Sequence, residues 1–188
     1  MIEVRRAADR LRTEREGIVS RHSFSAGAHY DPDNIAFGPV IGVDEHRLAG
    51  GAGFERHAHT GVIIISWVLD GALLHQDAAG SRTIGPGETL RQDASQGIEH
   101  VERNASDAEP LRFVQTTLLS SGPKPGFAVV RRAARERLPV VPLMHLYVAR
   151  GAFSLSGREV TEGDSARIRS QVVTATGNGE LLMVTFEP

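Results

Sequence analysis

Cysteine is absent from the 188-residue sequence. Its absence excludes disulfides, thiolate nucleophiles and thiolate metal ligands. Long apolar runs are missing too, because no segment approaches the ~20 consecutive apolar residues that a membrane-spanning helix needs. The residues from Met1 to Arg5 contain no apolar secretory segment. We therefore expect a cytoplasmic location and no association with a membrane.

An excess of charge of either sign is also missing. The formal net charge is −2, which gives no overall attraction to nucleic acids or anionic membranes. One local basic stretch, residues 131–137, is short and has no interleaved aromatic residues. We interpret it as solvated surface and expect no direct nucleic-acid partner.

Turn-forming residues are abundant, with 20 glycines and nine prolines in a chain that is 40% hydrophobic and 23% charged. Residues 62–69 form an apolar, β-branched run that predicts a buried strand, and Asp70-Gly71 after it is a strong hairpin-turn signal. Residues 111–118 predict another strand. Short strands at this spacing indicate an antiparallel sandwich or barrel. Near the start, residues 1–4 predict an edge strand and residues 7–16 a short helix with a thin apolar face.

The second half of the chain repeats features of the first. Residues 146–151 resemble residues 66–71, since both are apolar runs that end in glycine. Residues 162–164 likewise resemble residues 86–88, each with a central glycine beside an acidic residue. This self-similarity predicts two related β units in one chain.

A linker is expected at residues 120–126, which are glycine, proline, serine and lysine only. We therefore predict one domain over residues 1–120 and a second, shortened one over residues 127–188. The second has a single histidine, His145, and no paired metal ligands. We expect it to bind no metal.

Two pairs of metal-ligand side chains stand out in the first domain. His57 and His59 are two residues apart, and so are His100 and Glu102. On a β-strand, residues two apart point to the same face. If the two strands are neighbours, three imidazoles and one carboxylate converge, a donor set that suits zinc, copper, iron or nickel. Four such groups would be costly to bury without a partner, so we predict a metal site.

The remaining histidines are interpreted as structural. They are His22, His29, His46, His75 and His145. His75 is the exception to watch, since its strand is placed to point it into the interior that holds the metal ligands.

The spacing of these residues resembles the two cupin motifs, with Gly51, His57, His59 and Gly71 in the first and Gly97, His100 and Asn104 in the second. The wider pattern resembles the pirin family, whose members are bicupins. The segments that carry this resemblance are 21–25, 30–32, 37–39, 51–54, 104–106 and 109–113.

The resemblance implies an all-β fold of two antiparallel β-barrels of the cupin (jelly-roll) type, packed face to face. It implies one divalent metal in the N-terminal barrel, most often Fe2+, with zinc, nickel, manganese, cobalt and copper as alternatives. The ligands carry over onto His57, His59, His100 and Glu102. Several pirins are quercetinases, and others are described as transcriptional coregulators or redox-sensing partners of other proteins.

The sequence departs from the pirin pattern in two places. Pirins commonly have a glutamate a few residues after the second histidine, and Ile63 occupies the most closely matching position here. We expect this change to remove a carboxylate from near the metal. The chain is also short for a pirin, and the missing length lies after Gly126.

Three hypotheses follow from these residues together with the resemblance to the pirin family. The first is a metal-dependent dioxygenase of the quercetin 2,3-dioxygenase type, which opens a flavonol-like aromatic substrate with O2. In it the metal acts as a Lewis acid and Glu102 is the candidate base. The alternative is a non-catalytic, iron-binding redox sensor that is read by a partner protein, an idea that the loss of the glutamate at Ile63 favours. The third hypothesis is a metal-free structural bicupin.

Overall fold

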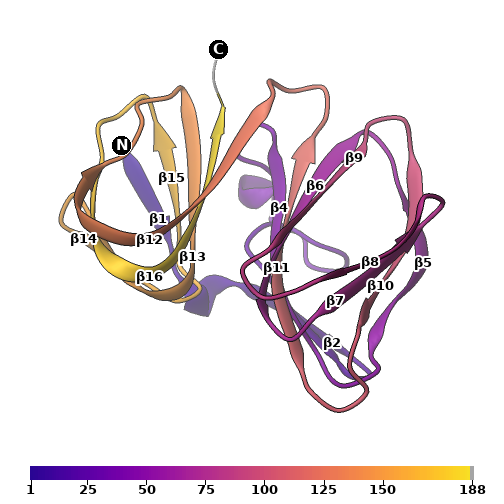
Figure 1. Cartoon of the computed structure of the whole chain (residues 1–188). Coiled ribbons are helices and arrows are strands. Elements are labelled where there is room, and N and C mark those ends of the chain that lie inside the picture. Colours follow the sequence, from indigo (N-terminus) through magenta and orange to yellow (C-terminus); the bar gives the residue numbers. More distant parts are fainter. Residues whose placement is uncertain (187–188) are drawn as a thin grey trace. The chain divides into compact units, whose positions relative to one another are not determined.

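The computed structural model describes residues 1–186, which form sixteen β-strands and two short 3-10 helices (Figure 1). The fold is therefore all-β, as predicted. The chain divides into two compact units. We call Leu11–Gly122 unit I, and we call Met1–Arg10 together with the chain from Pro123 onward unit II. Within the described residues, no helix has the length and apolar character needed to cross a bilayer.

Unit I consists of two antiparallel sheets, visible as two layers in Figure 1. The larger has the strand order β2-β3-β4-β11-β6-β9 and the smaller the order β5-β10-β7-β8. The strands are β2 (Leu11–Arg15), β3 (Ile18–His22), β4 (Val40–Leu48), β5 (Gly53–His59), β6 (Val62–Asp70), β7 (Leu73–Asp77), β8 (Gly80–Ile84), β9 (Thr89–Ala94), β10 (Ile98–Asn104) and β11 (Leu111–Leu119).

The two sheets of unit I form the predicted cupin-like arrangement, as a sandwich whose sheets do not close into a barrel. Turns break the chain where it passes from one sheet to the other, so the backbone ladder does not continue around the corner. Gly71 is one such break, with φ of 73°, a value that L-residues with a side chain rarely adopt. A Cβ there would also press on the carbonyl oxygen of Pro110.

The core of unit I lies between the two sheets. Its buried residues come from both layers: Ile18, Leu48, Val68, Leu73, Ile84, Leu90, Leu111 and Phe113. Fully burying a side chain of this size stabilises the fold by about 1.5–3 kcal/mol. The core therefore holds the two layers together although their ladders are separate.

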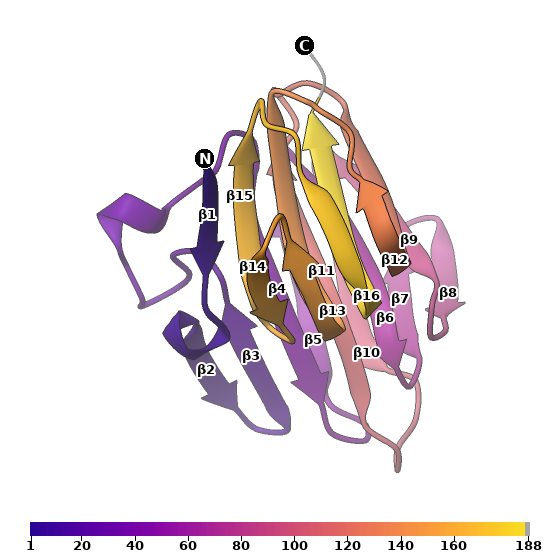
Figure 2. The same cartoon turned by 90° about the vertical axis from the view of Figure 1, so that its left-hand side faces the viewer.

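Unit II is built on one sheet with the order β1-β15-β13-β16-β12, and β14 pairs with β13. The strands are β1 (Ile2–Arg5), β12 (Pro125–Arg137), β13 (Leu143–Leu155), β14 (Arg158–Thr161), β15 (Ser165–Arg169) and β16 (Thr174–Phe186). The predicted edge strand at the start of the chain is confirmed as β1, which lies beside β15 (Figure 2).

The first ten residues belong to unit II, whereas the sequence prediction grouped residues 1–120 in one domain. β1 pairs with β15, and a buried carboxylate fixes the residues that follow. Asp164 accepts hydrogen bonds from the Arg6 guanidinium at 2.8 Å and from the Ala7 amide at 2.7 Å. These contacts link positions far apart in the sequence, which is why local patterns did not reveal them.

The helix predicted for residues 7–16 is wrong. Only Ala7–Asp9 forms a single 3-10 turn, labelled η1, and Leu11–Arg15 is strand β2. The second 3-10 helix, η2, spans Pro32–Asn34 in the loop before β4. The thin apolar face of residues 7–16 reflects the alternation of an edge strand, since β2 pairs only with β3 in its sheet.

The predicted internal repeat is present in the hydrogen bonding of both units. In unit I the Gly87 amide donates to the Val68 carbonyl at 2.9 Å. In unit II the Gly163 amide donates to the Val148 carbonyl at 2.7 Å. The strand order β4-β11-β6-β9 in unit I also matches β12-β16-β13-β15 in unit II. The two units are thus versions of one cupin-type motif.

Candidate metal centre

The two predicted ligand pairs lie on neighbouring strands. β5 and β10 are antiparallel, with His100 opposite His57 and Ile98 opposite His59. One extra residue is inserted in β5 between Phe54 and His57, which is a β-bulge. A bulge re-aims side chains, and here Phe54 packs against the core of unit I while His57 turns towards His100.

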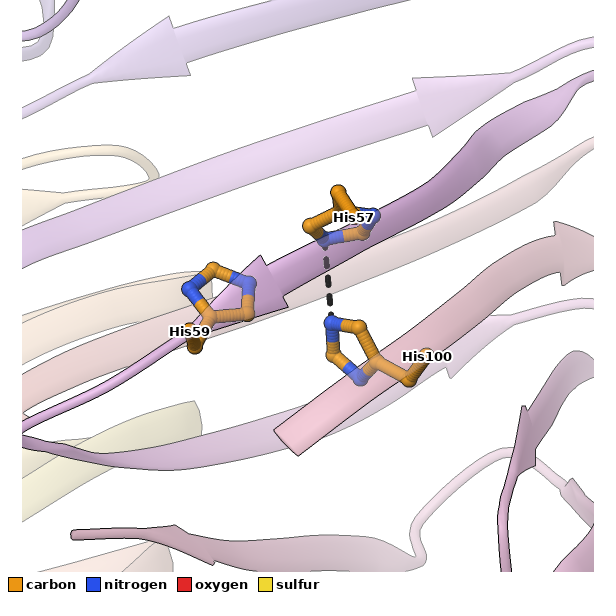
Figure 3. Close-up of side chains that lie close together, drawn as sticks. All are labelled: His57, His59 and His100. Atoms are coloured by element: carbon orange, nitrogen blue, oxygen red, sulfur yellow. Dashed lines mark hydrogen bonds between the residues drawn. The ribbon is translucent and has the colours of Figure 1, made fainter. Parts of the chain in front are cut away.

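Three imidazoles converge at this point, as Figure 3 shows for His57, His59 and His100. One ring nitrogen from each lies within 4.8 Å of the others. The Nε2 atoms of His57 and His100 are 2.9 Å apart. The Nε2 atom of His59 is buried and has no hydrogen-bond partner among the described residues. Two nitrogens that face each other and a third without a partner are what a shared cation would satisfy, so the residues fit a metal.

The electrostatics of the cluster favour neutral imidazoles. Burial, together with smaller contributions from the neighbouring His57, His59 and His75, lowers the pKa of His100 to about 3. Burial also lowers the pKa of His59, with a smaller contribution from His57. Neutral imidazole is the form that binds metals, because the ligand nitrogen must be deprotonated.

Hydrogen bonds fix the tautomers of two of these rings. The Nδ1–H of His57 donates to the carbonyl oxygen of Glu55 at 2.7 Å. The Nδ1–H of His100 donates to the Oε1 atom of Gln92 at 2.7 Å. In each ring the Nε2 lone pair is therefore left to face the centre, the arrangement that is typical of histidines bound to metals.

Glu102 lies beside the three histidines but outside the tight cluster. Its Oε2 atom is 4.0 Å from Nε2 of His100. The amide of Gln115 donates to both carboxylate oxygens at 3.1 Å. Burial raises the pKa of Glu102, and the hydrogen bond from Gln115 and the nearby His57 and His75 oppose this.

Gln92 and Gln115 also belong to the site, although neither was predicted from the sequence. Gln92 lies between Leu90 and Ala94 on β9, and all three side chains are buried. A buried amide that alternates with apolar residues was the available signal. His75 does point into this interior, where its Nε2–H donates to Oε1 of Gln92 at 2.8 Å.

The expected effect of Ile63 on the centre is wrong. Ser66 of β6 accepts a hydrogen bond from Gln115, the residue that also contacts Glu102. Side chains alternate along a strand, so Ile64 faces the same way as Ser66 and Ile63 faces the opposite way. Ile64 is the inward residue, opposite Gln92 on β9. A carboxylate at position 63 would point away from the histidines.

A pocket opens beside His59. It has a volume of about 310 Å3 and is lined by Ala58, His59, Thr60, Gly97, Ile98 and Glu99. Apolar residues such as Ile98 and polar residues such as Thr60 and Glu99 therefore line the approach to one of the three histidines.

The fold and the histidine cluster together define the class: an all-β, cupin-type protein with a candidate metal centre in unit I. The Pirin family model matches residues 3–118, and the chain belongs to the pirin family. A Mycobacterium tuberculosis protein provisionally named quercetin 2,3-dioxygenase is 35% identical, with 97% of this chain and 93% of that protein aligned.

Other relatives support the same family. The quercetin 2,3-dioxygenase of Escherichia coli is 32% identical over 63% of this chain and 52% of its own length. Among solved structures, the bacterial pirin YhhW from Escherichia coli in complex with nickel(II) matches with a TM-score of 0.90 over 100% of both chains at 21% identity. A quercetin 2,3-dioxygenase from Acinetobacter baumannii matches with a TM-score of 0.71 at 17% identity over 100% of this chain and 79% of its own. These structural matches show the bicupin fold.

Proposed function

We propose that the histidine cluster of unit I binds one divalent metal and that the protein is a dioxygenase of the quercetin 2,3-dioxygenase type. The observation that carries this proposal is the facing pair of Nε2 atoms of His57 and His100 beside the unpartnered Nε2 of His59, among the described residues. The relatives named quercetin 2,3-dioxygenase and the nickel(II) complex of YhhW support it. Iron(II) and nickel(II) both suit this imidazole-rich donor set.

The metal would be held by His57, His59 and His100, with Glu102 as an adjacent carboxylate. When bound, it supplies Lewis acidity to an oxygen of the substrate. The part of the substrate nearest the centre lies in the pocket beside His59, where Ile98 provides an apolar wall. The substrate class that fits these features is a small, flavonol-like aromatic compound with an acidic hydroxyl group, with O2 as co-substrate.

Glu102 is the proposed base. It is 1% exposed, and burial raises its pKa. A carboxylate that is partly deprived of water is a stronger proton acceptor than one in solution. Gln115 holds both carboxylate oxygens in place, so the proton acceptor is oriented before the substrate arrives.

The redox-sensor alternative loses the argument that favoured it. That argument was the loss of a carboxylate near the metal at position 63, and Ile63 lies on the face of β6 opposite to Ser66, which is linked through Gln115 to Glu102. The dioxygenase therefore remains the function that the geometry supports best.

Metal analysis followed by an aerobic flavonol assay tests the proposal. Purified protein should carry close to one equivalent of metal, and His57→Ala or His100→Ala should remove most of it, whereas His29→Ala in a surface loop should not. Loaded with iron(II) or nickel(II), the wild type should consume quercetin absorbance and release carbon monoxide. One equivalent of metal in both histidine variants would refute the site. No turnover with iron, nickel, manganese or cobalt would refute the activity.

A further inference from the structure

A second constellation of reactive side chains lies on the other sheet of unit I. Thr13, His22 and Asp44 come from the adjacent strands β2, β3 and β4. The Oγ1 atom of Thr13 is 2.9 Å from Nε2 of His22. The Nδ1 atom of His22 is 2.8 Å from Oδ1 of Asp44. A hydroxyl, an imidazole and a carboxylate thus form one continuous hydrogen-bonded row.

Strand pairing explains why these residues meet. His22 is directly opposite Asp44 on β4, while Thr13 is opposite Ser20, two residues from His22 on the same face. Diagonal and direct cross-strand neighbours are within reach of each other's side chains. The row is therefore fixed by the sheet itself rather than by a loop.

The direction of each hydrogen bond follows from the carboxylate. An ionised Asp44 can only accept, so the proton between it and His22 is on Nδ1. In the neutral ring, Nε2 then has a lone pair, and the Thr13 hydroxyl donates to it. This is the polarity in which an imidazole serves as the general base for a hydroxyl nucleophile.

The row opens onto a pocket. The pocket has a volume of about 310 Å3, and its wall includes Thr13, Arg15, Ile18, Ser20, His22 and Phe54. The His22 side chain is 11% exposed and that of Asp44 20% exposed, so the row is sheltered but reachable. Ser20 is 5% exposed and hydrogen-bonded to His46 at 2.7 Å, which places it beneath the reachable surface.

The pocket also has a cation at its wall. The Arg15 guanidinium lies 4.7 Å from the centre of the Phe54 ring, within the range of a cation–π contact. An aromatic surface and a positive charge near the hydroxyl suit a small aromatic compound whose reacting oxygen gains negative charge.

We propose that Thr13, His22 and Asp44 form a metal-independent hydrolytic site for small aryl esters, separate from the histidine cluster. Thr13 Oγ1 attacks the ester carbonyl carbon and gives its proton to Nε2 of His22. The bond from this carbon to the aryloxy group breaks, and the phenol leaves with that proton. The products of this first step are an acyl-threonine and a phenol.

Water completes the cycle. A water molecule attacks the acyl carbon, and His22 takes one of its protons while the bond to Thr13 Oγ1 breaks. The proton returns from His22 to Thr13 Oγ1, and a carboxylic acid is released. The net reaction is ester plus water giving acid plus phenol, so it requires no oxidant or reductant.

Hydrolysis of p-nitrophenyl acetate by the full-length protein tests this site, with and without a chelator. We expect saturable hydrolysis that the chelator and the His57→Ala substitution leave unchanged. Thr13→Val keeps the shape of the side chain but removes the hydroxyl, and it should lower kcat/KM by at least about 10²-fold. Thr83→Val, on the exposed strand β8, is the matched control and should have no effect.

Two further measurements separate catalysis from folding. Thr13→Ser keeps a nucleophilic hydroxyl and should retain the activity. Peptide mass spectrometry after a short reaction should find the acetyl group on Thr13, and His22→Gln should abolish its accumulation. The proposal is overturned if the wild type is no faster than Thr13→Val, if Thr13→Ser behaves like Thr13→Val, or if the acetyl group is found only on amines. None of these outcomes depends on flavonol turnover.

Discussion

Units I and II share a backbone motif and differ in what fills its interior. Val68 on β6, Gly71 in the turn after it and His75 on β7 correspond to positions 80 residues later, because the carbonyl groups of Val68 and Val148 accept the same hydrogen bond from a glycine amide. His75 thus corresponds to Leu155. The glycines that donate these hydrogen bonds, Gly87 and Gly163, are 76 residues apart in the sequence. Gln92 on β9 therefore corresponds to Ile168 on β15. Leu155 and Ile168 both belong to the buried hydrophobic cluster of unit II.

The residues at these two positions distinguish what stabilises the fold from what belongs to the candidate site. In unit II these two positions contribute apolar burial, which stabilises the fold without any hydrogen bond. In unit I they hold a histidine and an amide that must be paired to be tolerated. Unit I pairs them with His100, at the edge of the candidate metal centre. At these two positions the motif therefore requires no polar side chain, and in unit I the histidine and the amide lie beside the candidate metal centre.

The strands differ in the same sense. In unit II, β12, β13 and β16 run for 13 residues each. In unit I the chain is broken at the corresponding places, so that β5, β7, β8 and β10 form a sheet of their own. The histidines of the cluster lie on this separate sheet. The orientation of a separate sheet can differ from that of the first sheet, whereas a strand that continues through one sheet keeps that sheet's orientation.

The largest expected effect concerns the carboxylate that unit I places beside its cluster. Glu102→Gln keeps the shape and one oxygen but is a poor base. We expect it to retain much of the metal and to lose ring-opening activity by about 10²–10⁴-fold. Metal analysis and quercetin consumption measured on the same sample check this. A variant that keeps both metal and rate would place the base elsewhere.

Acid should destabilise both units, each through its own buried histidine. Burial lowers the pKa of His46 in unit I to about 4 and that of His145 in unit II to about 3. In the unfolded chain histidine titrates near 6.5, so below that pH only the unfolded state gains the proton. The stabilising contribution is thus complete above about pH 6.5 and is lost as the pH falls, by roughly 3 kcal/mol for each histidine at pH 4.

Urea unfolding between about pH 7 and pH 4, with a chelator present, measures this loss. His145→Gln cannot take up the proton, so its unfolding free energy should fall less steeply with acid than that of the wild type. His29→Gln, in a surface loop, is the control and should follow the wild type. An equal slope in His145→Gln and the wild type would contradict the assignment.

The shared motif can be tested at its two corresponding glycines. Gly71 and Gly151 have φ values of 73° and 76°, and a Cβ at either would press on a backbone carbonyl, that of Pro110 or Asn178. Alanine at each should lower the free energy of unfolding by roughly 2–3 kcal/mol, from strain and contact together. Gly61→Ala is the control, since its φ is 71° but nothing lies within 4 Å of the added Cβ.

Gly61→Ala should cost about 1–2 kcal/mol from backbone strain alone. Thermal or denaturant unfolding of the three variants makes the comparison. If Gly71→Ala and Gly151→Ala differ strongly from each other, the two positions are not equivalent.

The smallest expected effect comes from giving unit I a residue that unit II already has. Gln92→Ile should remove the hydrogen bond that orients His100 and weaken metal binding by about 10–100-fold. The unfolding free energy of the chelated protein should fall by about 1–3 kcal/mol, because His75 and His100 lose the Oε1 atom that accepts their buried hydrogen bonds. A titration of the metal-free protein with nickel(II) checks this. Unchanged affinity would show that Gln92 does not position the ligand.

Much of the centre could be predicted from the period of a β-strand. His57 and His59 on one strand and His100 on another needed only alternation and one pairing to meet. The bicupin fold was implied by the resemblance to the pirin family, and two related β units were predicted from the similarity of residues 66–71 to residues 146–151. Both are patterns of residues close together in the sequence, which can be recognised without knowing the structure.

Other features depend on contacts that no local pattern contains. Ile63 was assigned to the metal side by its distance from His59, and only the pairing of β6 with β9 and β11 shows which face it takes. Gln92 and Gln115 are single amides on β9 and β11, and their contacts with His100 and Glu102 exist only because strands of the two sheets face each other. Strand β1 pairs with β15, which is too far away in the sequence for a local pattern to indicate the pairing.

That last pairing sets an order of events during biosynthesis. Ile2 pairs with Ile168, so β1 leaves the ribosome long before its partner and has to wait without one. Unit I is contiguous from Leu11 to Gly122 and can fold during that wait, since domains generally fold as units while the chain is made. Unit II closes after unit I, and it closes around a strand that was made before unit I. A change at the start of the chain would therefore be felt in the unit made at its end.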